Sequence, residues 1–229
     1  MNDYRNIKLG FLENHKQNKP IFTDTLVRFV ECIRNGQWSD EIELVREAVR
    51  EHGRNSTPHQ TLKDALPGVV LSVEFSSRSK DLPDDKKFIG YNFILQDDSD
   101  LHDEKILGEW KQKFSKDKYR LFTAISPSGD GLKSAIAFKL PEGITINASN
   151  LRDYHNRIAD YYHQFKKDQY GIGNDPSVCD PFRICYVTYD PEVVENFDDV
   201  VPIEIPKEVF EEKVIVEKQK NLTNRERRR

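Results

Sequence analysis

Three short stretches of the sequence carry side chains that could act together on a phosphate or a metal ion. The first is an acidic cluster, Asp97, Asp98 and Asp100, which follows the apolar run of residues 88–95. Carboxylates spaced one or two residues apart where a strand ends can hold Mg²⁺ or Mn²⁺ together with substrate phosphates. The alternative is a solvated turn, or acidic residues at the positive end of a following helix.

The second stretch, residues 126–133, has the sequence SPSGDGLK. Gly129 and Gly131 would let the backbone reach positive φ and expose consecutive N–H groups as an anion-binding nest. The hydroxyls of Ser126 and Ser128 and the ammonium of Lys133 could converge on the same phosphate. The spacing is not that of a Walker motif, and the stretch leads into a strand. The alternative is an ordinary hairpin turn.

The third stretch, DPSVCDPFR, contains Asp175, Asp180 and Arg183. Asp175, or Asp180 in its place, could complete a metal site begun by the acidic cluster. Arg183 could clamp a phosphate through two parallel hydrogen bonds. The alternative is that Asp180-Pro181 is turn chemistry and that Arg183 is one half of a buried ion pair.

Length, charge and cysteine content limit the setting of these residues. A chain of 229 residues with a mean hydropathy of -0.73 predicts a soluble protein of one large or two small domains, and no apolar run is long enough for a membrane span. Three cysteines without a C-x-x-C pair fit a reducing cytoplasm and give no zinc site. The net charge is -4, but the segment Lys213–Arg229 carries +5, which leaves -9 for the preceding residues. Nucleic-acid contacts must therefore use a local groove or this tail.

The hydrophobic pattern predicts the elements that position the three stretches. Helices are expected at 23–34, from 39 to about 53, at 102–115 and at 150–167, and strands at 69–75, 88–95, 121–125, 134–140 and 182–189. Intermixed helices and strands indicate an α+β fold with one mixed or antiparallel central sheet flanked by helices. We divide the chain into an N-terminal helical arm (1–55), a core domain (56–206) and a charged basic tail or linker (207–229).

Four segments in order resemble the VirE N-terminal domain family of bacterial mobile elements and phages. They are LKDALPGVVLSVEFSSR, FILQDD, FTAISPSGDGLKSAIAF and DPSVCDPFRICYVTYDPEVVEN, within roughly residues 60–200. Such domains commonly precede a helicase domain and are similar to the archaeo-eukaryotic primase fold. The resemblance aligns Gln96 and Asp98, and then Asp175, with the residues that bind two divalent metals for nucleotidyl transfer, and in a shifted register Asp98, Asp100 and Asp175 would bind them. It also implies that Lys133 contacts nucleotide phosphates.

Two positions depart from the pattern of an active primase. Gln96 replaces the first metal-binding carboxylate, unless Asp98 and Asp100 form the pair, and Lys133 replaces a histidine. The resemblance therefore favours a primase-like domain that works in replication and binds single-stranded nucleic acid or a nucleotide at a degenerate site. The alternatives are an active, metal-dependent primase-polymerase and a non-catalytic interaction module linked to a helicase.

Overall fold

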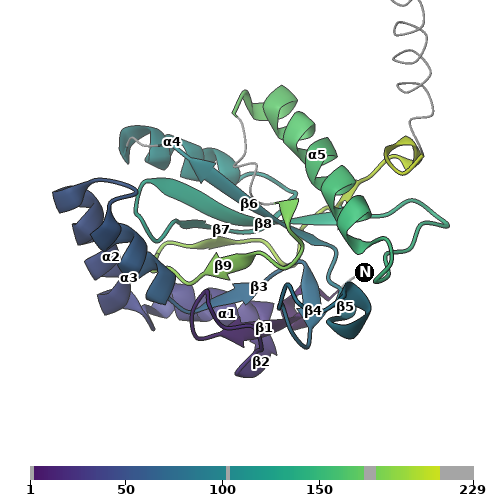
Figure 1. Cartoon of the computed structure of the whole chain (residues 1–229). Helices are drawn as coiled ribbons and strands as arrows, with labels where there is room; N and C mark the ends of the chain where they lie inside the picture. The colour runs from purple at the N-terminus through teal and green to yellow at the C-terminus, as the bar shows by residue number, and fades with distance from the viewer. Residues whose placement is uncertain (1–2, 102–103, 173–178, 212–229) are drawn as a thin grey trace, which may run out of the picture.

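The computed structural model describes residues 3–101, 104–172 and 179–211, and its fold is α+β (Figure 1). Its centre is the predicted hairpin of β7 (Arg120–Ile125) and β8 (Gly131–Lys139). β6 (Ile94–Asp100) pairs antiparallel with the other edge of β8. Two short strands extend this five-stranded sheet: β10 (Val194–Glu195) beside β7 and β11 (Ile203–Glu204), which runs parallel to β8.

A second, four-stranded sheet lies against the first and is antiparallel throughout. Its order is β2 (Phe22–Thr25), β1 (Lys8–Leu12), β3 (Gly68–Val70) and β9 (Ile184–Tyr186). β1 pairs with both β2 and β3. The N-terminal segment therefore contributes strands as well as helices to the body of the protein.

The expectation of one central sheet is wrong, because two of the predicted strands are each divided. The run 69–75 becomes β3 and β4 (Val73–Phe75), and the run 88–95 becomes β5 (Phe88–Tyr91) and the start of β6. Phe93 has a φ of 55°, a left-handed conformation that breaks a strand. The break between β3 and β4 falls at Leu71–Ser72, where Asn92 binds both carbonyl groups. The Asn92 N–H donates to Ser72 O at 3.0 Å, and its Nδ2 donates to Leu71 O at 2.8 Å. β4 and β5 consequently form a separate two-stranded sheet.

The helices cover the two main sheets on different sides (Figure 1). α4 (Glu104–Phe114) and α5 (Leu151–Tyr170) lie over the outer face of the five-stranded sheet, where Ile158 and Tyr162 pack on Leu95 and Ile136. On its inner face, side chains from both sheets share one hydrophobic core with α1 (Leu26–Asn35) and α2 (Ser39–His52). α3 (Thr57–Ala65) stands beside α2 at one end of the sheets.

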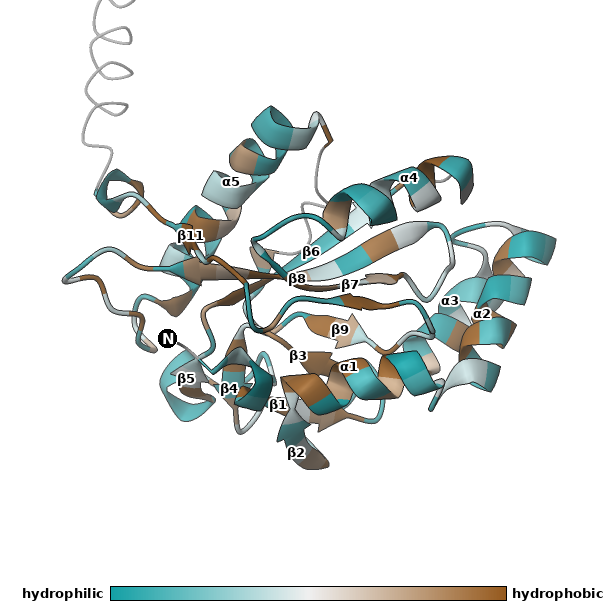
Figure 2. Ribbon diagram, turned by 180° about the vertical axis from the view of Figure 1, so that it is seen from behind, coloured by the Kyte–Doolittle hydropathy of each residue, from teal (hydrophilic) through white to brown (hydrophobic). Residues whose placement is uncertain are grey.

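Hydropathy follows this arrangement (Figure 2). The central strands are rich in hydrophobic residues, whereas the peripheral helices contain many hydrophilic residues. Among the described residues, none of the helices has the length and apolar character needed to cross a membrane.

Candidate anion-binding site

The acidic cluster of residues 97–100 is part of a strand. The prediction that it follows the strand is wrong, because β6 pairs with β8 from Ile94 opposite Ala137 to Asp100 opposite Gly131. Successive side chains of a strand point to opposite faces. Asp97 therefore faces α5, whereas Asp98 and Asp100 face the inner side of the sheet.

Asp97 belongs to a buried ion-pair network beneath α5. Its carboxylate accepts hydrogen bonds from Lys166 Nζ at 2.6 Å, Arg120 Nη1 at 2.7 Å and the Tyr162 hydroxyl at 3.0 Å. Burial raises the pKa of Asp97, but the charges of Lys166 and Arg120 outweigh burial and lower the pKa to about 2. Asp97 thus joins β6 to β7 and α5, and it is separated by the sheet from the other acidic residues.

Asp98 and Lys133 form an ion pair on the inner face. They lie opposite each other in the β6–β8 pairing, with Lys133 Nζ 3.5 Å from Asp98 Oδ1. Burial by itself lowers the pKa of Lys133, but the Asp98 charge outweighs it and the pKa is raised. Gln96 Nε2 donates to the other Asp98 oxygen at 2.8 Å. Gln96 therefore fixes the orientation of the carboxylate next to it.

Arg54 reaches the same face from the turn between α2 and α3. Its neighbours Gly53 and Asn55 have φ values of 82° and 64°, so the chain turns sharply at this point. Arg54 donates to Asp100 Oδ1 and to Asp130 Oδ2, each at 2.7 Å. One guanidinium thus connects the end of β6 with the β7–β8 turn.

The β7–β8 turn does not form the expected backbone nest of two glycines. The Gly129 N–H donates to Ser126 O at 3.0 Å, and the Ser126 N–H donates to Gly131 O at 2.8 Å, so these amides are used inside the turn. Gly129 has a φ of 81°, but Gly131 belongs to β8, where a Cβ would lie 2.5 Å from Ser99 O. The turn therefore presents hydroxyl groups to its surroundings.

His59 of α3 holds one of these hydroxyls in place. Its Nδ1 accepts a hydrogen bond from the Asn55 N–H at 3.2 Å, and its Nε2 lies 3.0 Å from Ser128 Oγ. Burial, followed by the charges of Lys63 and Arg54, lowers the pKa of His59. A neutral ring whose Nδ1 accepts must carry its proton on Nε2, which donates to Ser128. The Ser128 hydroxyl hydrogen is then available to an acceptor in the pocket.

Lys63, one turn further along α3, has a different environment from Lys133. No carboxylate in the part of the chain that the structure describes lies within ion-pair distance of Lys63, and its Nζ sits 6.0 Å from the ring centroid of Tyr186. Burial, with repulsion from Lys133 and Arg54, lowers the pKa of Lys63. Ser126 Oγ is also buried in this region and has no hydrogen-bond partner. Ser126 Oγ lacks the hydrogen-bond partner that its burial requires, and the half-buried Lys63 has no anion within ion-pair distance among the described residues.

These side chains line one small pocket between the two sheets, with a volume of about 60 Å³. That is roughly the liquid volume of two waters, enough for one tetrahedral oxyanion. The pocket contains four cationic and two acidic side chains, so its formal charge is +2. The full lining is Arg54, Lys63, Asp98, Asp100, Ser126, Pro127, Ser128, Leu132, Lys133, Arg183, Ile184 and Tyr186.

The pocket brings together many, but not all, of the residues that the sequence indicated. Asp98, Asp100, Ser126, Ser128, Lys133 and Arg183 line it. Gly129 and Gly131 belong to the adjoining turn. Asp180 is elsewhere, where it accepts a hydrogen bond from Arg152 Nη1 at 3.2 Å. Asp175 lies outside the described residues, as does the tail from residue 212 onward, whereas Lys207–Val209 form a short 3₁₀ helix, η4.

The charge of the pocket disfavours a divalent cation at Asp98 and Asp100. Each carboxylate already has a cationic partner, Lys133 or Arg54, and a metal ion would have to displace it. A three-ligand cluster suited to a metal ion occurs elsewhere in the described part of the chain, at Asp160, His163 and Cys179. Binding of Mg²⁺ or Mn²⁺ by Asp98, Asp100 and Asp175 stays a prediction.

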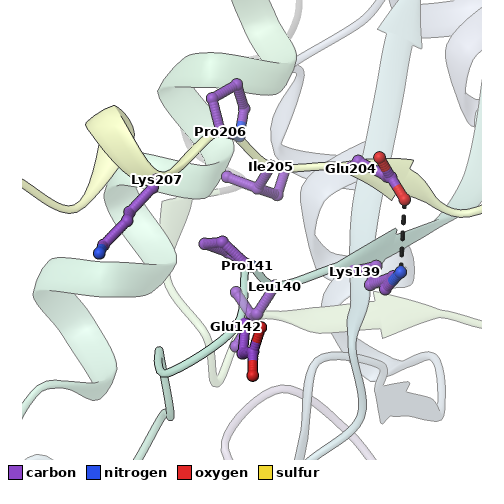
Figure 3. Close-up of a pocket in the computed structure, with 8 residues that line it drawn as sticks. All are labelled: Lys139, Leu140, Pro141, Glu142, Glu204, Ile205, Pro206 and Lys207. Atoms are coloured by element: carbon purple, nitrogen blue, oxygen red, sulfur yellow. Dashed lines mark hydrogen bonds and ion pairs between the residues drawn. The ribbon is translucent and has the colours of Figure 1, made fainter.

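A larger hollow of about 540 Å³ lies where β8 and β11 end (Figure 3). Its charged lining is balanced, because two lysines, Lys139 and Lys207, are matched by two glutamates, Glu142 and Glu204, and Lys139 Nζ lies 3.3 Å from Glu204 Oε1. This hollow has no excess of cations to attract an anion, so its size does not make it the better candidate.

Sequence reasoning missed three contributors, Arg54, Lys63 and Tyr186. Arg54 and Lys63 precede the motif by about seventy residues, and Tyr186 reads as an ordinary strand residue. Only the packing of α3 against the β7–β8 turn, fastened by His59 and Ser128, brings Lys63 beside Lys133.

One comparison with known proteins gives a family. A family model described as BT4734-like, N-terminal domain matches residues 61–194, and the chain belongs to that family. No curated protein and no solved structure matches the chain.

The resemblance to the VirE N-terminal domain family is therefore wrong, because the matching family is a different one and no primase family matches. The expectations of primase, replication, mobile-element and phage function came from that resemblance and lose their support. The helicase partner came from the same source, and no comparison tests it.

Proposed function

We propose that this member of the BT4734-like N-terminal domain family binds a phosphate group of a nucleotide or nucleic acid in the pocket between its two sheets. The observation that supports this most strongly is the convergence of Arg54, Lys63, Lys133 and Arg183 on a space of about 60 Å³. The proposal rests on these contacts and not on a primase-like fold, which no comparison supports.

A bound phosphate would supply the partners that Lys63 and Ser126 lack. Its negative charge would offset the repulsion among Lys63, Lys133 and Arg54, and its oxygens would accept hydrogen bonds from the Ser126 and Ser128 hydroxyls. Hydrogen bonds to charged groups typically contribute about 1.5–3 kcal/mol each, so a few of them support measurable binding.

The same contacts favour binding over metal-dependent catalysis. Nucleotidyl transfer by two metals needs several carboxylates free to coordinate. Asp98 is ion-paired with Lys133 at 3.5 Å and accepts a hydrogen bond from Gln96 on its other oxygen, and Asp100 is ion-paired with Arg54. In our proposal these acidic residues position the cations and keep out ligands that lack sufficient negative charge.

Isothermal titration of the full chain with ATP and with inorganic pyrophosphate tests the proposal. We expect Lys63→Gln to weaken binding of both by about tenfold or more, which is at least about 1.4 kcal/mol. Lys139→Gln is the matched control, since it removes the same charge from the balanced hollow of Figure 3. Equal affinities of the two variants, or no binding by the unmodified chain, would overturn the proposal.

A further inference from the structure

A second cation-rich cleft lies beside the pocket. Its volume is about 440 Å³. Four cationic and two acidic side chains give it the same formal charge of +2 as the first pocket. The lining residues are Arg78, Lys80, Leu82, Pro83, Asp84, Lys87, Arg152, Asp180 and Phe182.

The acidic residues of this cleft are already paired, whereas one of its arginines is not. Asp84 forms ion pairs with Lys87 at 3.0 Å and with Arg152 at 2.9 Å. Arg152 also forms an ion pair with Asp180 at 3.2 Å. Arg78 has no carboxylate within ion-pair distance in the described ranges, and its guanidinium donates only to His15 O at 3.4 Å. Burial lowers the pKa of Arg78. A partly buried guanidinium without an anion is suited to receive one.

Neither cleft follows from a generally basic surface. The chain before Lys213 carries a formal charge of -9, yet both clefts carry an excess of cations. Local concentrations of positive charge on an acidic protein attract anions to those places and repel them elsewhere.

Consecutive residues connect the two clefts. Phe182 lines the second cleft and Arg183 lines the first, and adjacent Cα atoms are about 3.8 Å apart. Tyr186 of the first pocket also lies close enough to Arg78 for the two side chains to interact electrostatically. A flexible chain of phosphates could therefore pass from one cleft to the other along the start of β9.

The second cleft also offers apolar surface next to its cations. The Leu82 side chain is exposed at 41%. Phe182 also lines the cleft but is itself buried, with Lys87 Nζ and the Arg152 guanidinium at 5.0 and 5.4 Å from its ring centroid. Sugars and bases need apolar contacts, which inorganic polyphosphate does not, and two separate clefts suit a flexible single strand better than a rigid duplex.

We infer that the two clefts hold neighbouring phosphates of one single-stranded nucleic acid, with Arg78 and Lys80 as the second subsite. This inference rests on the proposed function of the first pocket and extends it to a defined class of ligand. In this arrangement the nucleic acid places one phosphate in the first pocket, passes over β9 and places the next phosphate in the second cleft.

Fluorescence anisotropy with labelled oligothymidines of increasing length tests the inference, with ATP as the mononucleotide probe. The variant is Arg78→Gln/Lys80→Gln, and Arg28→Gln/Lys139→Gln is the control with the same change of charge at exposed positions. We expect affinity in the unmodified chain to rise with oligonucleotide length. The Arg78/Lys80 variant should bind ATP normally and oligonucleotides about tenfold more weakly, with a salt slope smaller by roughly one to two.

The outcomes separate this inference from the proposed function. If the Arg78/Lys80 variant matches its control on oligonucleotides, or if duplex DNA or inorganic polyphosphate binds more tightly than the single strand, the inference is overturned. If Lys63→Gln leaves ATP binding unchanged, the proposed function fails first. Near-ultraviolet circular dichroism confirms that each variant is folded before its binding is compared.

Discussion

At the scale of single residues, the candidate site is defined by two lysines in unlike states. Lys133 has its own carboxylate partner, and its pKa is raised by Asp98 despite burial. The pKa of Lys63 is lowered, because burial and repulsion from Lys133 and Arg54 outweigh the attraction of Asp98 and Asp100. Lys63 is therefore the residue whose protonation should respond most to a bound anion.

This contrast predicts that phosphate binding weakens as pH rises. A bound anion favours protonated Lys63, so the pKa of Lys63 is higher in the complex than in the free protein, and binding takes up protons. Affinity should then fall as pH rises through the lowered pKa of free Lys63 toward the ordinary lysine value of about 10.4. A phosphate ester, whose second pKa is about 6, stays fully ionised across this range.

Titrations at several pH values, in buffers of different ionisation enthalpy, measure this proton uptake. Lys63→Arg is the control, because its guanidinium remains charged and should remove most of the pH dependence. An equal pH dependence in both proteins would contradict the role given to Lys63.

At the scale of elements, β6 has different partners on its two faces. Asp98 and Asp100 reach the candidate site, whereas Asp97 joins the strand to α5 and β7. The sequence DDSD alone does not show which of its carboxylates points to which face, because alternation between faces applies only if the strand extends through these residues, as β6 does. The hairpin and the residues of its turn could be predicted, since turn-formers between two apolar runs are a local signal. Arg54 and Lys63 could not, because only tertiary packing brings α3 to the hairpin.

Asp97→Asn should destabilise the protein by about 3–5 kcal/mol, since it removes the carboxylate that pairs with buried Lys166 and leaves buried Arg120 with Asp117 as its remaining ion-pair partner among the described residues. Tyr162→Phe removes one hydrogen bond to the same carboxylate and should cost only about 1 kcal/mol. Urea denaturation of the three proteins gives these differences.

The pKa of Asp97, about 2 in the folded state against an ordinary 3.8, also means that the contribution of Asp97 to stability is lost as pH falls through this interval. A neutral effect of Asp97→Asn would show that the network is dispensable.

Gly131→Ala should destabilise the β6–β8 pairing by about 1–3 kcal/mol. The new Cβ would lie 2.5 Å from Ser99 O, a backbone atom that cannot move without shifting β6. Gly108→Ala in α4 is the control, where a Cβ meets nothing within 4 Å and the change should stabilise by roughly 0.5–1 kcal/mol. Thermal unfolding measures both variants. Similar melting temperatures would mean that the close approach at Gly131 relaxes easily.

At the scale of the whole molecule, two antiparallel sheets share one hydrophobic core, and the candidate site lies where they meet. The α+β class and the approximate places of most helices and strands could be predicted from periodicity. The division into separate sheets could not, because it depends on Phe93 adopting a left-handed conformation and on the contacts of Asn92. Lys133 comes from one sheet, Arg183 directly precedes β9 at the edge of the other, and α2 and α3 lie at the end of the two sheets. The pocket is thus a property of the assembled fold.

The most direct test of this account is amide chemical-shift mapping by NMR as ATP is added to the isotope-labelled full chain. The account predicts that the largest shifts occur in three separate segments that meet at the pocket: residues 54–63, 126–133 and 183–186. Lys63→Gln should reduce these shifts at the same ATP concentration. Shifts centred on residues 139–142 and 204–207, around the hollow of Figure 3, would contradict the account, as would shifts that Lys63→Gln leaves unchanged.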